Sequence, residues 1–223
     1  FCNVELSNFY FDIAKDTLYT TASKSKARRS VQTVLAKLLS VLVRVLAPVN
    51  PHMAEDIWQH VPKALKEHSF KEESVLLADY PVVDQSLLNP NLDQFWSQLI
   101  ITRDTVNKAL EQARAARKIG SSLEAQVLIK VEDTSLSDKI ISLGENLPGF
   151  FITSQAQVEN GKGTTKLESL DPLSELSENG MNIFVLKAEG QKCGRCWKYT
   201  TTIGEDKAFA ELCKPCAEVE SAK

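Results

Sequence analysis

The chain has 223 residues, of which 43% are hydrophobic and 25% charged, and its formal net charge is −3 at pH 7. These proportions are ordinary for a globular protein, and they exclude a chain that is mostly disordered, collagen-like or coiled-coil. No apolar run approaches the ~20 residues that a membrane-spanning helix needs, which excludes a spanning segment. Because the sequence begins with Phe1 and not with Met, we expect it to be a piece of a longer protein.

Basic residues are concentrated near the start of the chain. Residues 15–44 contain seven basic residues and one acidic residue, Asp16, whereas residues 119–190 contain 5 basic and 11 acidic residues. A basic stretch within a mildly acidic protein favours a localised contact with a polyanion.

The first 118 residues read as helical. Apolar residues recur every three or four positions between residues 31 and 45, which predicts a helix with one buried stripe. The stripe consists of Val31, Val34, Leu35, Leu38, Leu42 and Val45.

A short helix is predicted next, with Asn50 as its N-cap and Pro51 at its first position. Met53, Ile57 and Trp58 are expected to point inward from it. Residues 62–91 contain three prolines and few periodic apolar residues, so we expect a long, mostly irregular connection.

A second long helix is predicted from Leu92 to Lys118, ending at Gly120. Its apolar and small residues alternate steps of four and three, the pattern of a helix packed along a bundle. They are Phe95, Leu99, Thr102, Val106, Ala109, Ala113 and Ala116.

Cations near these helices predict a phosphate-binding surface for structured RNA. Arg103 and Arg114 are eleven residues apart and therefore lie on the same side of the second helix. The full set on the helical part is Lys24, Lys26, Arg28, Arg29, Arg103, Arg114, Arg117 and Lys118. Composition alone favours the alternative that these are ordinary solvated charges.

Beyond Gly120 the pattern changes to that of a small α+β unit. Gln126–Val131 is a predicted strand, and Ser135 opens a predicted helix that runs through Leu143. Two further strands are predicted at Phe150–Thr153 and Asn182–Leu186, with a turn at Gly161-Lys162-Gly163 between them.

Four of the five cysteines form two C-x-x-C pairs separated by sixteen residues. Each pair places two thiolates on one side of a tight loop, and two pairs complete a tetrahedral shell for one Zn²⁺ ion. The predicted ligands are Cys193, Cys196, Cys213 and Cys216. Four cysteine ligands close the site, so the metal is structural and supplies the folding energy of a very small module. A pair of disulfides and a thioredoxin-like redox pair are the weaker alternatives.

Aromatic and cationic side chains surround the two cysteine pairs, a mixture that suits stacking on unpaired bases beside phosphates. The candidate RNA-binding residues here are Arg195, Trp197, Lys198 and Lys214. The alternative, of equal weight, is that Trp197 packs the core of the small module.

Segments along the whole chain carry a resemblance to a known family. They include Phe9-Tyr10-Phe11-Asp12-Ile13, Ser25-Lys26-Ala27-Arg28-Arg29-Ser30, Ala47-Pro48 with Pro51-His52, Val106-Asn107-Lys108, Gly120-Ser121-Ser122-Leu123-Glu124-Ala125 and the run from Lys187 to Tyr199. Together they resemble the C-terminal part of bacterial-type isoleucyl-tRNA synthetases, which are class I enzymes.

The resemblance implies a chain that binds RNA and has no catalytic residue of its own. ATP and Mg²⁺ would be used only in an upstream catalytic domain. The same full-length polypeptide would also contain an editing domain. The implied partner is the anticodon stem-loop of isoleucine tRNA, and we expect a monomer with no membrane partner. The implied compartment is the cytoplasm of a bacterium, with a mitochondrion or a chloroplast as the alternative.

The predicted fold class is mainly α. A helical-bundle anticodon-binding domain at residues 1–120 is followed by a small α+β connecting domain at 121–188 and a zinc-ribbon-like module with four cysteine ligands at 189–223. Two alternatives in function stay open: a stand-alone RNA-binding or scaffold module derived from such a synthetase, and a zinc- or thiol-dependent enzyme.

Overall fold

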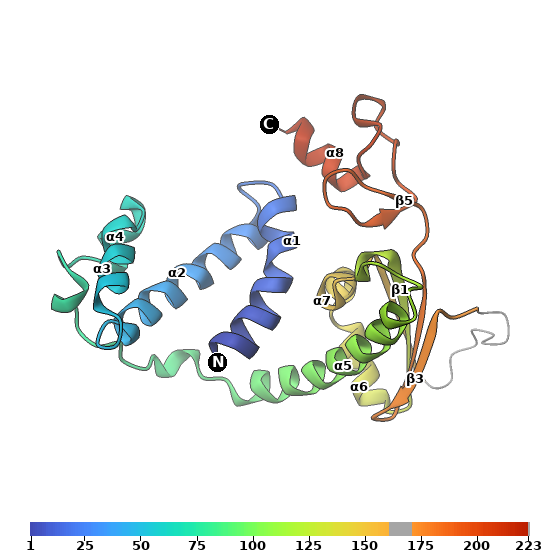
Figure 1. Ribbon diagram of the computed structural model, residues 1–223, viewed down its shortest axis with the longest axis horizontal. Helices are drawn as coiled ribbons and strands as arrows, with labels where there is room; N and C mark the ends of the chain where they lie inside the picture. The colour runs from blue at the N-terminus through green and yellow to red at the C-terminus, as the bar shows by residue number, and fades with distance from the viewer. Residues whose placement is uncertain (161–170, 223) are drawn as a thin grey trace. The chain divides into compact units, whose positions relative to one another are not determined.

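The computed structural model describes residues 1–160 and 171–222 (Figure 1). The chain divides into two compact units, one made of Phe1–Thr20 with Asn89–Lys223 and the other of Thr21–Leu88. The predicted fold class is confirmed: helices dominate the N-terminal part, a small mixed sheet follows, and the four cysteines cluster near the C-terminus. The predicted turn at Gly161-Lys162-Gly163 lies outside the described residues. Among the described helices, none is long and apolar enough to cross a membrane.

The unit Thr21–Leu88 is helical. It contains α2 (Lys26–Leu46), α3 (Pro51–His60) and α4 (Lys63–Ser69), followed by the short 3-10 turns η2 (Val75–Leu77) and η3 (Gln85–Leu87). Leu39, Val43 and Ala47, along α2 and at its end, face the core of the unit, so the side of α2 that packs within this unit is rotated by about one residue from the predicted stripe. The core is closed by Trp58 and Phe70, whose ring centres lie 4.8 Å apart.

One expectation for the short helix α3 is wrong. Met53 is 45% exposed rather than inward-pointing, whereas Trp58 is buried. The connection expected to be mostly irregular contains one α-helix, α4, whose N-cap residue is Pro62 and which includes the helix-forming residues Ala64 and Leu65.

The other unit is built around α5 (Pro90–Ala115), with η1 (Cys2–Phe11, π-helical) and α1 (Asp12–Thr20) contributed by the start of the chain. The Asn89 side chain accepts a hydrogen bond from the Leu92 N–H at 3.0 Å, so α5 begins two residues before its predicted start. The predicted stripe is confirmed at Leu99, Thr102, Val106, Ala109 and Ala113, which are fully buried.

Four strands form a mixed sheet in the order β2-β1-β4-β3. The strands are β1 (Ala125–Val131), β2 (Gln155–Asn160), β3 (Ser174–Glu178) and β4 (Met181–Lys187), preceded by the 3-10 turn η4 (Ser122–Glu124). β1 pairs parallel with β2 through α6 (Thr134–Ile141), η5 (Gly144–Asn146) and α7 (Leu147–Phe151), and antiparallel with β4. The strands predicted at Gln126–Val131 and Asn182–Leu186 are therefore confirmed.

The strand predicted at Phe150–Thr153 is wrong. Phe150 and Phe151 end α7, and Ile152 adopts a left-handed φ of 57° that closes the helix. Both phenylalanines are buried from a helix, because a short run of large apolar residues fits a helix end as well as a strand. The cap of α6 is Asp133 rather than Ser135, since the Asp133 carboxylate accepts the Ser135 N–H at 2.8 Å.

The C-terminal module contains the hairpin β5 (Gln191–Lys192) with β6 (Tyr199–Thr200), the 3-10 turn η7 (Lys207–Phe209) and α8 (Lys214–Ser221). The Gln155 side chain, at the start of β2, donates to the Tyr199 carbonyl at 2.8 Å and accepts the Glu189 N–H at 3.1 Å. The Tyr199 N–H also donates to Ser154 Oγ at 2.7 Å. Side-chain contacts therefore join the module to the edge of the sheet.

Candidate metal centre and nucleic-acid interface

The four cysteines come together from two tight turns. Cys193 and Cys196 follow β5, while Cys213 is the N-cap of α8 and Cys216 lies in the first turn of that helix. Their sulfur atoms all lie within 4.8 Å of one another, and the Cys196 and Cys213 sulfurs are 3.7 Å apart. A tetrahedral site with Zn–S bonds of about 2.3 Å has edges of about 3.8 Å, so the predicted cluster is confirmed and its geometry fits zinc.

Backbone N–H groups point at the sulfur atoms. Burial alone would raise the pKa of Cys193, but N–H groups of Cys213, Cys196 and Arg195 outweigh it and lower that pKa to about 6. Burial raises the pKa of Cys213 to about 11 and also raises that of Cys196, with a contribution from neighbouring sulfurs. The backbone N–H groups therefore favour the thiolate of Cys193, whereas burial opposes deprotonation of Cys196 and Cys213, a cost that a bound divalent cation would offset.

The hairpin that carries the first cysteine pair depends on two unusual backbone positions. Gly190 has a φ of +87°, and a Cβ there would collide with the Thr200 carbonyl group, a clash that only glycine avoids. Trp197 has a φ of 66°, and its N–H donates to the Cys193 carbonyl at 3.1 Å. A bulky residue in this left-handed region is strained.

The Trp197 side chain is 61% exposed, so it is not the packed core residue of the module. The Lys192 ammonium lies 5.5 Å from the centre of its ring. An exposed aromatic ring on a rigid turn with a cation beside it has the chemistry of a stacking platform for an unpaired base.

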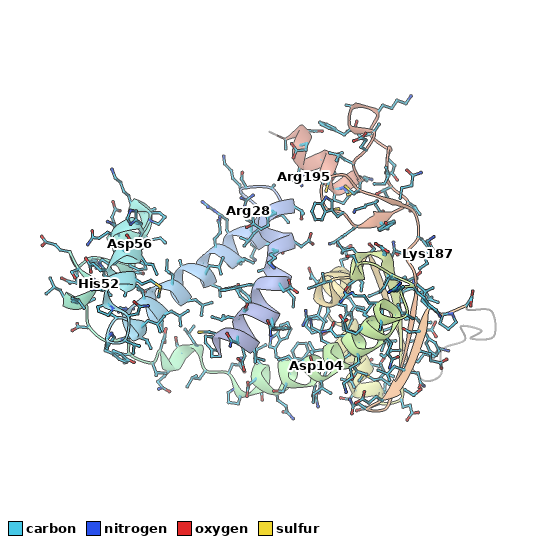
Figure 2. All side chains as sticks on the ribbon, viewed as in Figure 1. Arg28, His52, Asp56, Asp104, Lys187 and Arg195 are labelled. Atoms are coloured by element: carbon cyan, nitrogen blue, oxygen red, sulfur yellow. The ribbon has the colours of Figure 1, made fainter. Side chains whose placement is uncertain are left out.

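Two cations of the module bind the end of α1. Arg195 donates from Nη1 to the Thr20 carbonyl at 2.6 Å and from Nη2 to the Tyr19 carbonyl at 3.3 Å, and its Nε pairs with Glu220 of α8 at 2.9 Å (Figure 2 labels Arg195 near α8). Lys198 forms an ion pair with Asp16 at 2.6 Å. The predicted RNA contacts Arg195 and Lys198 are therefore already engaged by protein groups, whereas Lys214 is exposed at the start of α8.

A cavity of about 490 Å³ lies beside these contacts, and α1, Leu123, the end of α7 and the first cysteine turn line it. Its residues are Asp12, Ile13, Lys15, Asp16, Tyr19, Thr20, Leu123, Gly149, Ile152, Arg195, Cys196, Trp197 and Lys198. Its walls are mostly apolar, and each of its three cations is paired within the protein: Lys15 with Asp12, Lys198 with Asp16 and Arg195 with Glu220. Such a cavity suits a flat heterocycle.

In the unit Thr21–Leu88, the predicted cations gather where α2 begins. Lys24, Lys26 and Arg29 are exposed, and Arg28 is half-buried with its guanidinium donating to the Thr21 carbonyl at 3.3 Å. No acidic residue occupies the first turn of α2, which Ser25 caps. Positive side chains therefore add to the positive end of the helix dipole, and this favours an anion such as phosphate.

The cations predicted on α5 lie in different environments. Arg103 is 7% exposed, its Nε donates to the Phe150 carbonyl at 3.0 Å and it stacks over the Phe9 ring, so it is a packing residue. Arg114 is held by Glu111 and Ser122, and Lys118 donates to the Leu173 carbonyl at 2.8 Å. Arg117 is exposed just beyond the helix.

Asp16 and Glu220 are site residues that the sequence analysis missed. Each one pairs with a cation that is distant in sequence, and Asp16 and Lys198 are 182 positions apart. The one available signal was the position of Asp16 as the single acid within a basic stretch.

Comparison with known proteins adds the following matches. A model described as "Anticodon-binding domain of tRNA ligase" matches residues 1–129, and one described as "Zinc finger found in FPG and IleRS" matches residues 190–219. The isoleucine–tRNA ligase of Gloeobacter violaceus is 45% identical over 218 residues, which cover 97% of this chain and 20% of the relative. The chloroplastic/mitochondrial isoleucine–tRNA ligase of Arabidopsis thaliana is 40% identical over 230 residues, covering 98% of this chain and 21% of the relative. The chain thus spans about a fifth of the length of these curated relatives.

Proposed function

Because this chain belongs to the family of anticodon-binding domains of tRNA ligases, we propose that it is the tRNA-binding portion of an isoleucine–tRNA ligase. The full enzyme would convert ATP, L-isoleucine and isoleucine tRNA into isoleucyl-tRNA, AMP and diphosphate. The observation that carries this proposal is that one chain contains both the anticodon-binding match and the zinc-finger match. An isoleucine–tRNA ligase also aligns with 97% of this chain.

Two surfaces bind different parts of the anticodon stem-loop. The cations at the start of α2 bind phosphates of the stem, and they supply affinity that does not depend on base sequence. Trp197 and the cavity beside it receive a base that has left the stack of the loop, because single-stranded bases are read by stacking and by their exposed edges. Four thiolates would hold one Zn²⁺, whose contribution is structural: it fixes the turn that presents Trp197.

This portion contributes to catalysis at a distance. RNA-binding energy gained here orients the acceptor end of the tRNA in an active site that lies in another part of the polypeptide. Since the Arabidopsis relative is named as chloroplastic/mitochondrial, we place the working protein in a bacterial cytoplasm or in one of these organelles.

The test is a comparison of two RNA ligands. The zinc-loaded chain is titrated with isoleucine tRNA and with the same tRNA carrying a replaced anticodon. Tighter binding of the native anticodon is the expected result. Equal binding would leave a general RNA-docking surface, and no binding to either RNA would support a scaffold module instead.

Replacing Arg28 and Arg29 together with alanine is expected to weaken binding of both RNAs alike. The slope of log affinity against log salt should become shallower by about one for each phosphate that is no longer neutralised. Titration at four or more salt concentrations measures this slope. The matched control replaces Lys63 and Lys71, two exposed cations of the same unit, and an equal effect of both pairs would make Arg28 and Arg29 ordinary surface charges.

A further inference from the structure

The contact between the C-terminal module and α1 uses specific chemistry. The last carbonyls of a helix have no N–H partner within it and carry the negative end of its dipole. The Arg195 guanidinium donates hydrogen bonds to two of these carbonyls, those of Tyr19 and Thr20. Its Nε forms an ion pair with the Glu220 carboxylate. This contact orients the module on the end of α1.

The second point of contact is an ion pair with an acidic residue. Lys198 Nζ lies 2.6 Å from one carboxylate oxygen of Asp16, and the Thr20 hydroxyl lies 3.2 Å from the other. The two ionic side chains are 29% and 37% exposed, so solvent screens them only in part. Asp16 therefore fixes the residue that directly follows Trp197, just as α1 and α8 fix Arg195 two positions before it.

The charge of Asp16 makes a direct role in RNA binding unfavourable. It is the only acid among residues 15–44, which contain seven basic residues, and a carboxylate repels the phosphates that such a stretch attracts. Its electrostatic effect on RNA affinity is thus negative. Asp16 nevertheless lines the cavity beside Trp197 and forms an ion pair with Lys198 of the C-terminal module.

We propose that Asp16 is a positioning residue that sets anticodon specificity. Acting through Lys198, it holds the Trp197 turn against α1 so that the cavity beside Trp197 keeps the shape that receives the base, and it makes no contact with RNA itself. This inference rests on the proposed function, because it concerns how the same site discriminates between anticodons.

The proposal predicts two effects of opposite sign when the carboxylate is removed. The Asp16→Asn chain carries one negative charge fewer and leaves Lys198 unpaired by Asp16, so its affinity for RNA in general should stay equal or rise. Its preference for the native over the replaced anticodon should fall by about three- to fivefold, the range for one partly exposed ion pair. A residue that only stabilises the fold would lower both affinities together.

The experiment measures the ratio of the two affinities for the zinc-loaded chain, together with its bound metal. Glu178→Gln is the matched control, since it also removes one negative charge and breaks an ion pair between two elements, that with Lys108 of α5 at 2.6 Å, and neither residue lines the cavity. A double-mutant cycle with Lys198→Gln tests whether Asp16 acts through Lys198. In the Lys198→Gln chain, adding Asp16→Asn should cause no further change in the ratio of the two affinities.

The outcomes separate the two proposals. If the unchanged chain shows no preference for the native anticodon, the proposed function fails and this inference fails with it. If the unchanged chain does discriminate, an Asp16→Asn chain with an undiminished ratio overturns the positioning role alone. Loss of bound metal in Asp16→Asn, or a full effect in the Lys198→Gln background, would also overturn it.

Discussion

Replacing Cys193 with serine is expected to release the metal and unfold the C-terminal module while the helices and the four-stranded sheet persist. Cys193 is the fully buried ligand, and the N–H groups of Cys213 and Arg195 are directed at its sulfur. Structural zinc contributes on the order of 10 kcal/mol to the folding of modules of this size, far more than their small apolar cores. Bound metal, measured by elemental analysis, should therefore fall from one ion per chain to near zero.

The matched control for this prediction is Cys2→Ser. Cys2 is exposed and lies outside the cluster, so its replacement removes a thiol without removing a ligand. Backbone amide spectra locate the unfolding, because resonances of residues 190–219 should collapse toward random-coil positions while those of α5 and β1 stay dispersed. Unchanged metal content in the Cys193→Ser chain would show that the four sulfurs do not form the site.

Acidification is expected to act in the same direction as the ligand substitution. Burial raises the pKa of Cys213 to about 11 and also raises that of Cys196, so metal binding at neutral pH must displace their protons. The metal-bound state binds fewer protons, and for this reason its stability rises with pH and falls as pH is lowered. Chelator competition at a series of pH values measures this dependence.

The sequence predicts the metal site well because the determining information is local. Each C-x-x-C turn holds two sulfur atoms on one side of a tight loop, so the spacing of the four cysteines is enough to indicate one site. The buried side of α5 is predictable for a similar reason, since Leu99, Val106 and Ala113 repeat at the period of a single helix. In both cases the spacing in the sequence is itself the structural signal.

The errors arise where tertiary contacts decide. Phe150 and Phe151 suit a strand by composition, but the crossover between β1 and β2 places them at the end of a helix that packs on the sheet. Arg103 fits a basic surface by helical spacing, yet it is buried against Phe9 and the Phe150 carbonyl. The Asp16–Lys198 pair joins the two ends of the chain, and no local pattern encodes such a partner.

Replacing Trp197 with alanine is expected to abolish most of the discrimination between anticodons. Stacking of one base on an aromatic side chain contributes about 1–3 kcal/mol, which corresponds to a loss of about five- to 150-fold in affinity for the native RNA. Affinity for the RNA with a replaced anticodon should fall less, because stacking accepts any base but only the base that fits the cavity beside Trp197 stacks fully, and phosphate contacts supply the rest. The matched control is Tyr80→Ala, since Tyr80 is 63% exposed and Trp197 is 61% exposed.

The backbone at Trp197 allows its role in RNA binding to be separated from any role in folding. Its φ of 66° lies in the left-handed region, which glycine adopts without the steric cost that a tryptophan pays. Trp197→Gly should therefore hold the metal at least as well as the unchanged chain and still lose the preference for the native anticodon. If this variant keeps both its metal and its preference, Trp197 is no stacking platform; if it loses its metal, the side chain stabilises the turn. A chain that keeps its metal and loses its preference shows that the Trp197 side chain serves RNA binding and is not needed to form the turn.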